Sequence, residues 1–146
     1  MHVVRLQPNS LPLARETFAM MGEVFAEDSW ITLSDEYLTD ILGQARVWMY
    51  AAVAADGPIG GLTAHQLPMT RSETSELLIY DLAIRSDWQR RGVGRALLQQ
   101  LLDDASAAGI GEVWVPADDT DLHALEFYRR TGGASQSVTI FTYPTR

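Results

Sequence analysis

The fold of this chain is decided by one short stretch of sequence, Gln89-Arg90-Arg91-Gly92-Val93-Gly94-Arg95-Ala96. A strand pattern occupies residues 76–84 before it, and apolar residues at steps of three and four mark a helix over 93–107. The two glycines permit a tight turn and let a ligand approach the backbone closely. The first N–H groups of the helix and the positive end of its dipole face that ligand. The stretch therefore predicts a strand–loop–helix that binds a phosphate group.

The chemistry of the loop favours a pyrophosphate over other nucleotide groups. Arg90, Arg91 and Arg95 add charge that pairs well with phosphate oxygens. A Walker loop ends in Gly-Lys-Ser/Thr, and the chain contains no lysine. A dinucleotide fingerprint has a third glycine three residues after Gly94, where Leu97 stands. A glycine-bearing helix start with surface arginines and no ligand is the remaining alternative.

The rest of the chain predicts a mixed α/β sheet with one parallel β-α-β crossover. Turn residues at 55–58 indicate a hairpin, and Ser34 and Gly43 are typical of the two ends of a helix. Strands are expected at 2–6, 47–53, 59–67, 76–84, 113–115 and 138–143, and helices at 11–25, 35–42, 93–107 and 122–130.

Length and composition bound the class of protein. The chain has 146 residues, 47% of them hydrophobic and 21% charged, which predicts a single globular domain with one core. No apolar run approaches the roughly 18 to 20 residues of a membrane span, and the start lacks the pattern of a secretory signal. A cytoplasmic location is expected. Without cysteine, and with only His2, His65 and His123 scattered along the chain, no metal site and no thiol nucleophile are expected.

Charge is unevenly distributed along the chain. The net charge of −8 disfavours nucleic acid as a partner, since phosphate binding depends on basic side chains. All 11 basic residues are arginine, and none lies between Arg15 and Arg46. That interval carries seven acids and a second acidic group follows later: Glu16, Glu23, Glu27, Asp28, Asp35, Glu36 and Asp40, then Asp118, Asp119 and Asp121. One surface is thus suited to an anion and another to a cation, although ordinary solvated faces account for many such acids.

Two motifs resemble a known family. Residues 89–94 are similar to the Gln/Arg-x-x-Gly-x-Gly/Ala signature of the GNAT superfamily of acyl-CoA-dependent N-acetyltransferases, and they follow a strand as that family requires. A second family pattern is resembled by Ala124, Phe127, Tyr128, Arg130 and Gly132, with Asp121 where asparagine is commonest. The resemblance implies the GNAT fold, a mixed and mostly antiparallel sheet with a central splayed parallel pair flanked by helices. It also implies acetyl-CoA as co-substrate, with no metal.

A narrower resemblance joins the chain to the GNAT-type aminoglycoside 3-N-acetyltransferases. Segments 61–68, 75–84 and 116–121 carry it, whereas His65 stands where that group has an aromatic residue. It implies that the acceptor is an aminoglycoside antibiotic, modified on its 3-amino group, and that resistance is the biological role. The amino-terminal third matches this group only at isolated points: Phe25, Ser34-Asp35 and Tyr37-Leu38.

The family resemblance also implies the donor site. The strand before the loop offers backbone groups to the pantetheine arm at Leu82 and Ile84, and an amide near Leu82 stabilises the developing oxyanion. The residues expected to hold acetyl-CoA are Leu82, Ala83, Ile84, Gln89, Arg90, Arg91, Gly92, Val93, Gly94, Arg95 and Ala96.

Two catalytic side chains are expected. An amine arrives protonated and cannot attack until a carboxylate takes its proton. Asp81 is the first candidate for this base, with Glu76 and Asp121 as alternatives; a purely structural role for Asp81 also stays open. By family resemblance, the hydroxyl of Tyr128 protonates the departing thiolate, the alternative being a tyrosine that only packs in the core.

Several acids are expected to hold a small cationic acceptor together, because each contact at a wet surface is weak. They are Asp118, Asp119, Asp121, Glu27 and Asp28. Two other functions stay open: acetylation of another amine, such as a polyamine, an amino acid or a protein amino terminus, and a module that binds acyl-CoA without turnover. A homodimer is possible, with the apolar segment 138–141 at its interface or closing the core.

Overall fold

The computed structural model describes residues 1–146, which form two compact units, 1–116 and 117–146. The first unit contains a sheet and three α-helices, and the second contains one helix. The elements are β1 (His2–Arg5), α1 (Leu11–Phe25), α2 (Asp35–Leu42), β2 (Val47–Ala54), β3 (Gly57–Pro68), β4 (Ser75–Ile84), a short 3-10 helix (Ser86–Trp88), α3 (Val93–Ala107), β5 (Glu112–Trp114) and α4 (Leu122–Arg130).

The five strands of the first unit lie in the order β1-β2-β3-β4-β5. The first four are antiparallel neighbours: short connections of the hairpin kind join β2 to β3 and β3 to β4, whereas α1 and α2 lie between β1 and β2 in the chain. β5 instead runs parallel to β4, since α3 carries the chain back along the sheet before β5 begins. The mixed, mostly antiparallel sheet with one parallel crossover is thus confirmed.

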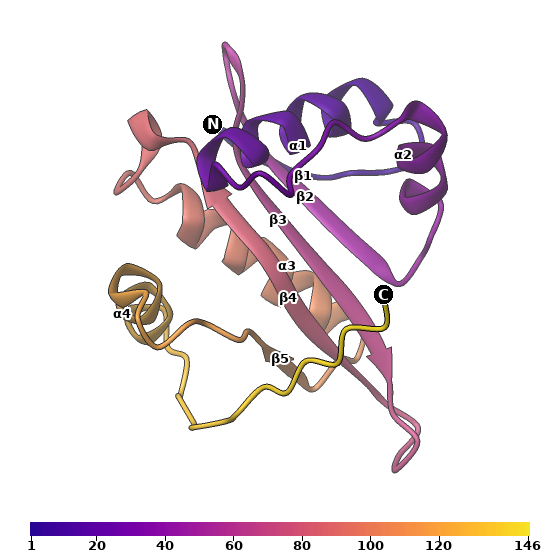
Figure 1. Ribbon diagram of the computed structural model, residues 1–146, viewed down its shortest axis with the longest axis vertical. Helices are drawn as coiled ribbons and strands as arrows, with labels where there is room; N and C mark the ends of the chain where they lie inside the picture. Colours follow the sequence, from indigo (N-terminus) through magenta and orange to yellow (C-terminus); the bar gives the residue numbers. More distant parts are fainter. The chain divides into compact units, whose positions relative to one another are not determined.

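Helices cover both faces of this sheet, α1 and α2 on one and α3 on the other (Figure 1). Gly60 and Gly61 of β3 show how closely they approach. A Cβ at Gly60 would lie 3.0 Å from side-chain atoms of Val93 and Leu97 in α3, whereas one at Gly61 would lie 2.9 Å from Thr17 in α1. Since neighbouring strand residues point to opposite faces, the absent side chains leave room for one helix on each side.

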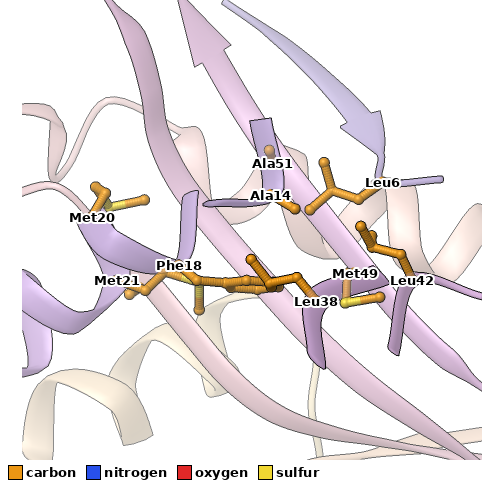
Figure 2. Packing of buried hydrophobic residues seen from close by; sticks show 10 residues of the cluster. Leu6, Ala14, Phe18, Met20, Met21, Leu38, Leu42, Met49 and Ala51 are labelled. Carbon is orange, nitrogen blue, oxygen red and sulfur yellow. The ribbon is translucent and has the colours of Figure 1, made fainter. Parts of the chain in front are cut away.

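An apolar cluster fills the space between the sheet and the pair α1 and α2 (Figure 2). It draws on one face of each helix, as the spacing of three and four predicts, and on inward residues of the strands. Ser34 begins α2 as its cap, with the side-chain oxygen accepting the N–H of Tyr37 at 3.2 Å. The buried members are Leu6, Ala14, Phe18, Met20, Met21, Leu38, Leu42, Met49, Ala51 and Ala83.

The predicted closing strand at 138–143 is wrong. Residues 134–146 have no regular secondary structure, and Val138 and Tyr143 are 65% and 84% exposed. A strand exists only through hydrogen bonds to a neighbouring strand, and the second unit contains no other strand with which these residues could pair. Alternating β-branched and aromatic residues are therefore not sufficient to form a strand at 138–143. The preceding helix α4 has the predicted bounds and is followed by Gly132 at φ +100°.

No helix of the chain is both long and apolar enough to cross a bilayer.

Candidate functional site

Strand β4 has a neighbour on both edges only along its first part. Residues 76–78 pair with β5, opposite 112–114, and the pairing then stops, whereas pairing with β3 continues to Ile84. The edge of β4 from residue 79 to 84 that faces away from β3 is therefore not covered by β5. We call this edge the β4 opening. β4 and β5 are therefore the splayed parallel pair of strands that the family resemblance implies.

The backbone of Leu82 and Ile84 faces the β4 opening. The N–H of Arg85 donates to the C=O of Ile59 in β3 at 2.9 Å, and the direction of these groups alternates from residue to residue. The N–H and C=O groups of Leu82 and Ile84 consequently point away from β3. The side-chain amide of Gln89 donates to the C=O of Ile84 at 3.2 Å, which ties the loop to the end of the strand.

The loop after β4 delivers the start of α3 without a side-chain cap. Arg90 and Gly92 have φ values of +61° and +82°, the left-handed region, which for Gly92 carries no steric penalty. The first helical hydrogen bond runs from the N–H of Ala96 to the C=O of Gly92 at 3.0 Å. The N–H groups of Val93 and Gly94 thus have no acceptor within the helix and mark its positive end.

The arginines of this region have different surroundings. Arg85 is bound to Asp87 and Asp56 at 2.7 and 3.0 Å, so its charge is already compensated. Arg91 is exposed, and its guanidinium carbon lies 5.1 Å from the ring centroid of Trp88. Arg90 is likewise exposed. Trp88 was not among the predicted site residues, since a single tryptophan in a loop carries no periodic signal.

A bulge in β4 sets the position of Asp81. Thr63 of β3 is opposite Asp81, whereas the next residue of β3, Ala64, is opposite Ile79, so Tyr80 is the extra residue. The hydroxyl of Thr63 donates to Oδ2 of Asp81 at 3.2 Å. Burial raises the pKa of the Asp81 carboxyl; the hydrogen bond from Thr63 acts in the opposite direction, and the negative charge of Glu27 adds to the rise.

Asp81 also lines a pocket of about 490 Å³ in the first unit, which we call the Asp81 pocket. Asp40 is the second carboxylate of its lining, which contains no Arg or Lys. His65 also lines the pocket. Its ring meets the exposed ring of Tyr80 edge-on, with the ring centroids 5.9 Å apart. The lining comes from α1, α2, the loops before and after α2, and three strands: Phe18, Ser29, Trp30, Ile31, Leu33, Tyr37, Asp40, Ile41, Gln44, Val47, Met49, Thr63, His65 and Asp81.

The two acids predicted from the first helix region, Glu27 and Asp28, are exposed in the loop that follows α1. Neither lines the Asp81 pocket, although Ser29 beside them does. Glu27 nevertheless acts on Asp81 through its charge. The alternative base, Glu76, has a different environment, since its carboxylate is bound to Arg71 at 2.6 Å. It lies where β4 and β5 are still paired, outside the β4 opening.

The second unit holds the remaining predicted residues. Burial and the negative charge of Asp121 raise the pKa of the Tyr128 hydroxyl to about 12. Asp121 is the cap of α4, accepting the N–H of Ala124 at 3.1 Å. Asp118 accepts the hydroxyl and the N–H of Thr120 at 2.6 and 2.8 Å, and these bonds lower its pKa. Asp119 is exposed.

Several residues of the Asp81 pocket were not predicted from sequence. Trp30, Tyr37 and Thr63 lie in three separate elements or loops, and only the folded sheet brings them beside Asp81. Asp40 was noted only as one acid of the basic-free interval. No group of three or more His, Asp or Glu side chains is arranged to hold a metal ion.

Comparison with known proteins agrees with this geometry. A family model described as "Acetyltransferase (GNAT) family" matches residues 14–133. The aminoglycoside acetyltransferase meta-AAC0020, from an uncultured soil metagenomic sample, has solved structures in complex with trehalose and with sisomicin. It is 32% identical to this chain with a TM-score of 0.95, covering 99% of this chain and 96% of its own. A second soil protein, aminoglycoside acetyltransferase HMB0005, is 29% identical with a TM-score of 0.93, covering 99% of this chain and 98% of its own.

The curated relatives match over a shorter region. The [ribosomal protein bS18]-alanine N-acetyltransferase of Escherichia coli strain K12 is 29% identical over 77 residues, 53% of this chain and 52% of the relative. The streptothricin acetyltransferase of Streptomyces lavendulae is 29% identical over 85 residues, 58% of this chain and 43% of the relative. The chain thus spans about half the length of the curated relatives it matches.

Proposed function

The chain belongs to the GNAT family of acetyltransferases, and from that premise we propose that it transfers an acetyl group from acetyl-CoA to the 3-amino group of an aminoglycoside, in a ternary complex. One observation carries the proposal. Asp81 lines a pocket without Arg or Lys, and the next residue, Leu82, turns its backbone to the β4 opening. A cationic amine and a thioester can therefore meet at two successive residues of one strand.

The donor side is supported by backbone geometry. The N–H groups of Val93 and Gly94 and the positive end of α3 suit the pyrophosphate of acetyl-CoA, with the guanidinium groups of Arg90 and Arg91 nearby in sequence. The backbone of Leu82 is oriented to bind the pantetheine arm and to donate its N–H to the thioester oxygen. Gln89 contributes indirectly, since its side chain holds the C=O of Ile84.

In the proposed reaction Asp81 is the general base. Its carboxylate takes a proton from the bound ammonium, and the nitrogen lone pair attacks the thioester carbon. The C–N bond forms, the C–S bond of the tetrahedral intermediate breaks, and the thiolate of coenzyme A leaves. Burial raises the pKa of Asp81 toward that of the group it must deprotonate, which makes it a stronger base than an exposed aspartate.

Tyr128 is the proposed general acid, which gives its hydroxyl proton to the departing thiolate. A pKa of about 12 means that the hydroxyl keeps its proton throughout the neutral range. The second proton of the amine leaves the nitrogen as the amide forms and restores the Tyr128 hydroxyl, and Asp81 passes the first proton to water. The absence of cysteine from the chain agrees with direct attack instead of a cysteine acyl-enzyme.

The acceptor class is supported by the charge of the site and by the aminoglycoside complex of meta-AAC0020. Glu27 acts on Asp81 through its charge. Glu27 and Asp28 directly precede Ser29, which lines the pocket. Asp119 and Asp121 are proposed to bind further ammonium groups of the acceptor. Asp118 is proposed to do the same while it orders its own turn through Thr120. A cytoplasmic location, a role in antibiotic resistance and a homodimer complete the proposal.

A second candidate function is acetylation of a peptide amino terminus. It is favoured by the similarity to the ribosomal protein alanine N-acetyltransferase over half of this chain. A polyamine or an amino acid is a related acceptor. A non-catalytic acyl-CoA-binding module is the alternative from a different class, and the presence of both Asp81 and Tyr128 disfavours it.

A thiol-release assay with acetyl-CoA separates these functions. The amine panel contains gentamicin, spermidine and a short peptide that begins with alanine, and NMR of the gentamicin product locates the new acetamide. We expect turnover with gentamicin and acetylation at its 3-amino group. Double-reciprocal plots of the initial rate should give intersecting lines, as a ternary complex requires. Preference for the peptide would establish the second candidate. Binding of acetyl-CoA by calorimetry without turnover on any amine would establish the non-catalytic module.

A further inference from the structure

Trp30, in the loop between α1 and α2, is fixed against the side of α1. Its indole N–H donates to the C=O of Phe18 at 3.0 Å, and its ring lies 5.4 Å from the ring of Phe25. Both partners belong to the same helix. The indole is therefore held by a directional hydrogen bond and by ring packing, which together limit its rotamers.

Gly22 provides the space that this indole occupies. A Cβ at position 22 would lie 2.9 Å from Cγ of Trp30 and closer still to its Cδ1 and Nε1. Gly22 is in the interior of a 15-residue helix, where glycine is less favourable than alanine. Local helix stability thus argues against a glycine here, whereas the seating of the indole requires one.

The same indole forms part of the lining of the Asp81 pocket. It is held by α1 on one side and meets the pocket on another. The pocket also has Tyr37, Asp40 and Asp81 in its lining. An aromatic face that is fixed in advance beside two carboxylates, with no Arg or Lys in the lining, matches a ligand that combines a ring with positive charge. Because the indole is already ordered, binding such a ligand immobilises little of the protein.

We propose that Trp30, seated on Gly22, is the specificity-determining residue of the Asp81 pocket, and that it stacks on a ring of the cationic acceptor. This inference deepens the proposed function and rests on it. The carboxylates recognise charge, which a linear amine also carries, whereas the flat indole gains more contact area from a ring than from a narrow linear chain. Trp30 therefore separates amino sugars from small or linear amines, and Gly22 acts as its positioning residue.

The first test compares Trp30→Ala with wild type on gentamicin and on spermidine. We expect the KM for gentamicin to rise roughly two- to thirtyfold, the range for losing the packing of a ring against an aromatic face. The kcat, the KM for acetyl-CoA and the KM for spermidine should stay within about twofold. Trp30→Phe keeps an aromatic ring and should restore most of the gentamicin affinity. An equal rise of both amine KM values in Trp30→Ala would overturn the proposal.

The second test places Gly22→Ala and Trp30→Ala in a double-mutant cycle. The methyl group at position 22 displaces the indole, so Gly22→Ala should raise the KM for gentamicin although residue 22 does not line the pocket. With the indole removed the methyl group finds room, and the double variant should match Trp30→Ala in KM while melting no lower. Additive losses in KM would contradict a shared mechanism. Gly111→Ala, whose Cβ meets no atom within 4 Å, is the matched control.

Intrinsic fluorescence keeps the inference separate from the proposed function. Gentamicin titrated into wild type and Trp30→Phe, both with coenzyme A present, should quench only the wild type. Saturable quenching that depends on Trp30, without acetylation of any amine, would end the proposed function and leave the inference standing. Acetylation of gentamicin with identical quenching and KM in both proteins would end the inference and leave the function standing.

Discussion

The proposed donor and acceptor sides of this site are built in different ways. The donor side uses consecutive residues, namely the end of β4, the 89–96 loop and the start of α3, and it presents mostly backbone groups. The acceptor side uses side chains from α1, α2 and three strands that meet only in the folded sheet. A backbone site tolerates many side chains but few changes of conformation. A side-chain site depends on individual residues, so single substitutions should separate the two.

The largest expected effect is on the acceptor side, at Asp81. We expect Asp81→Asn to lower kcat by roughly a thousandfold, because an amide cannot take the proton of the bound amine. The KM for acetyl-CoA should change little, since the carboxylate faces the Asp81 pocket. Steady-state kinetics at several pH values measure both. Near-normal turnover across pH would show that Asp81 is structural, and calorimetry with acetyl-CoA controls for folding.

Tyr128→Phe should have the next largest effect. We expect the single-turnover rate of acetyl transfer to fall roughly a hundredfold, since no hydroxyl remains to protonate the thiolate. The pKa of about 12 predicts that the wild-type rate shows no fall from ionisation of this group between pH 7 and 9. Rapid-quench measurement with saturating substrates isolates the step. An unchanged single-turnover rate would remove Tyr128 from the mechanism.

A substitution that disturbs the backbone at Gly92 should affect only the donor side. Gly92 has a φ of +82°, and alanine in that region costs roughly 1–2 kcal/mol. We therefore expect Gly92→Ala to weaken acetyl-CoA binding by about tenfold in calorimetry, because the start of α3 shifts or becomes less populated. The KM for the amine should be nearly unchanged. Equal losses for both substrates would show that the two sides are not independent.

The smallest expected effect is a shift in pH dependence. The hydrogen bond from Thr63 lowers the pKa of Asp81, against the larger rise caused by burial. Only the ionised carboxylate accepts a proton, so kcat/KM falls as the pH drops through this pKa. Thr63→Val removes the bond and raises the pKa, and the acid limb of the pH profile should move to higher pH by roughly half a unit. Thr63→Ser should leave it in place. A shift to lower pH would contradict the assignment of Asp81 as base.

Sequence patterns predicted most of the elements because those elements depend on neighbours along the chain. The bounds of α3 and α4 agree with the structure, and Ser34 caps α2 as expected. The segment 138–143 failed for the complementary reason, since a strand needs a partner that its own residues cannot supply. The candidate site divides along the same line. The conformation of the 89–96 loop could be predicted from consecutive residues, whereas the lining of most of the Asp81 pocket could not.

What the amino-acid sequence determined by itself is the glycine-containing loop at 89–96 and the positive, uncapped start of α3. Glycine conformation and helix N–H groups act over a few residues, so their spacing is enough. Only the tertiary structure decided the acceptor side. The bulge at Tyr80 depends on the register between β3 and β4, and the seat of Trp30 on Gly22 depends on a loop folding back against its own helix. Contacts across strands, or between a loop and a helix, leave no periodic pattern in the sequence, and we propose that these contacts set which amine the pocket accepts.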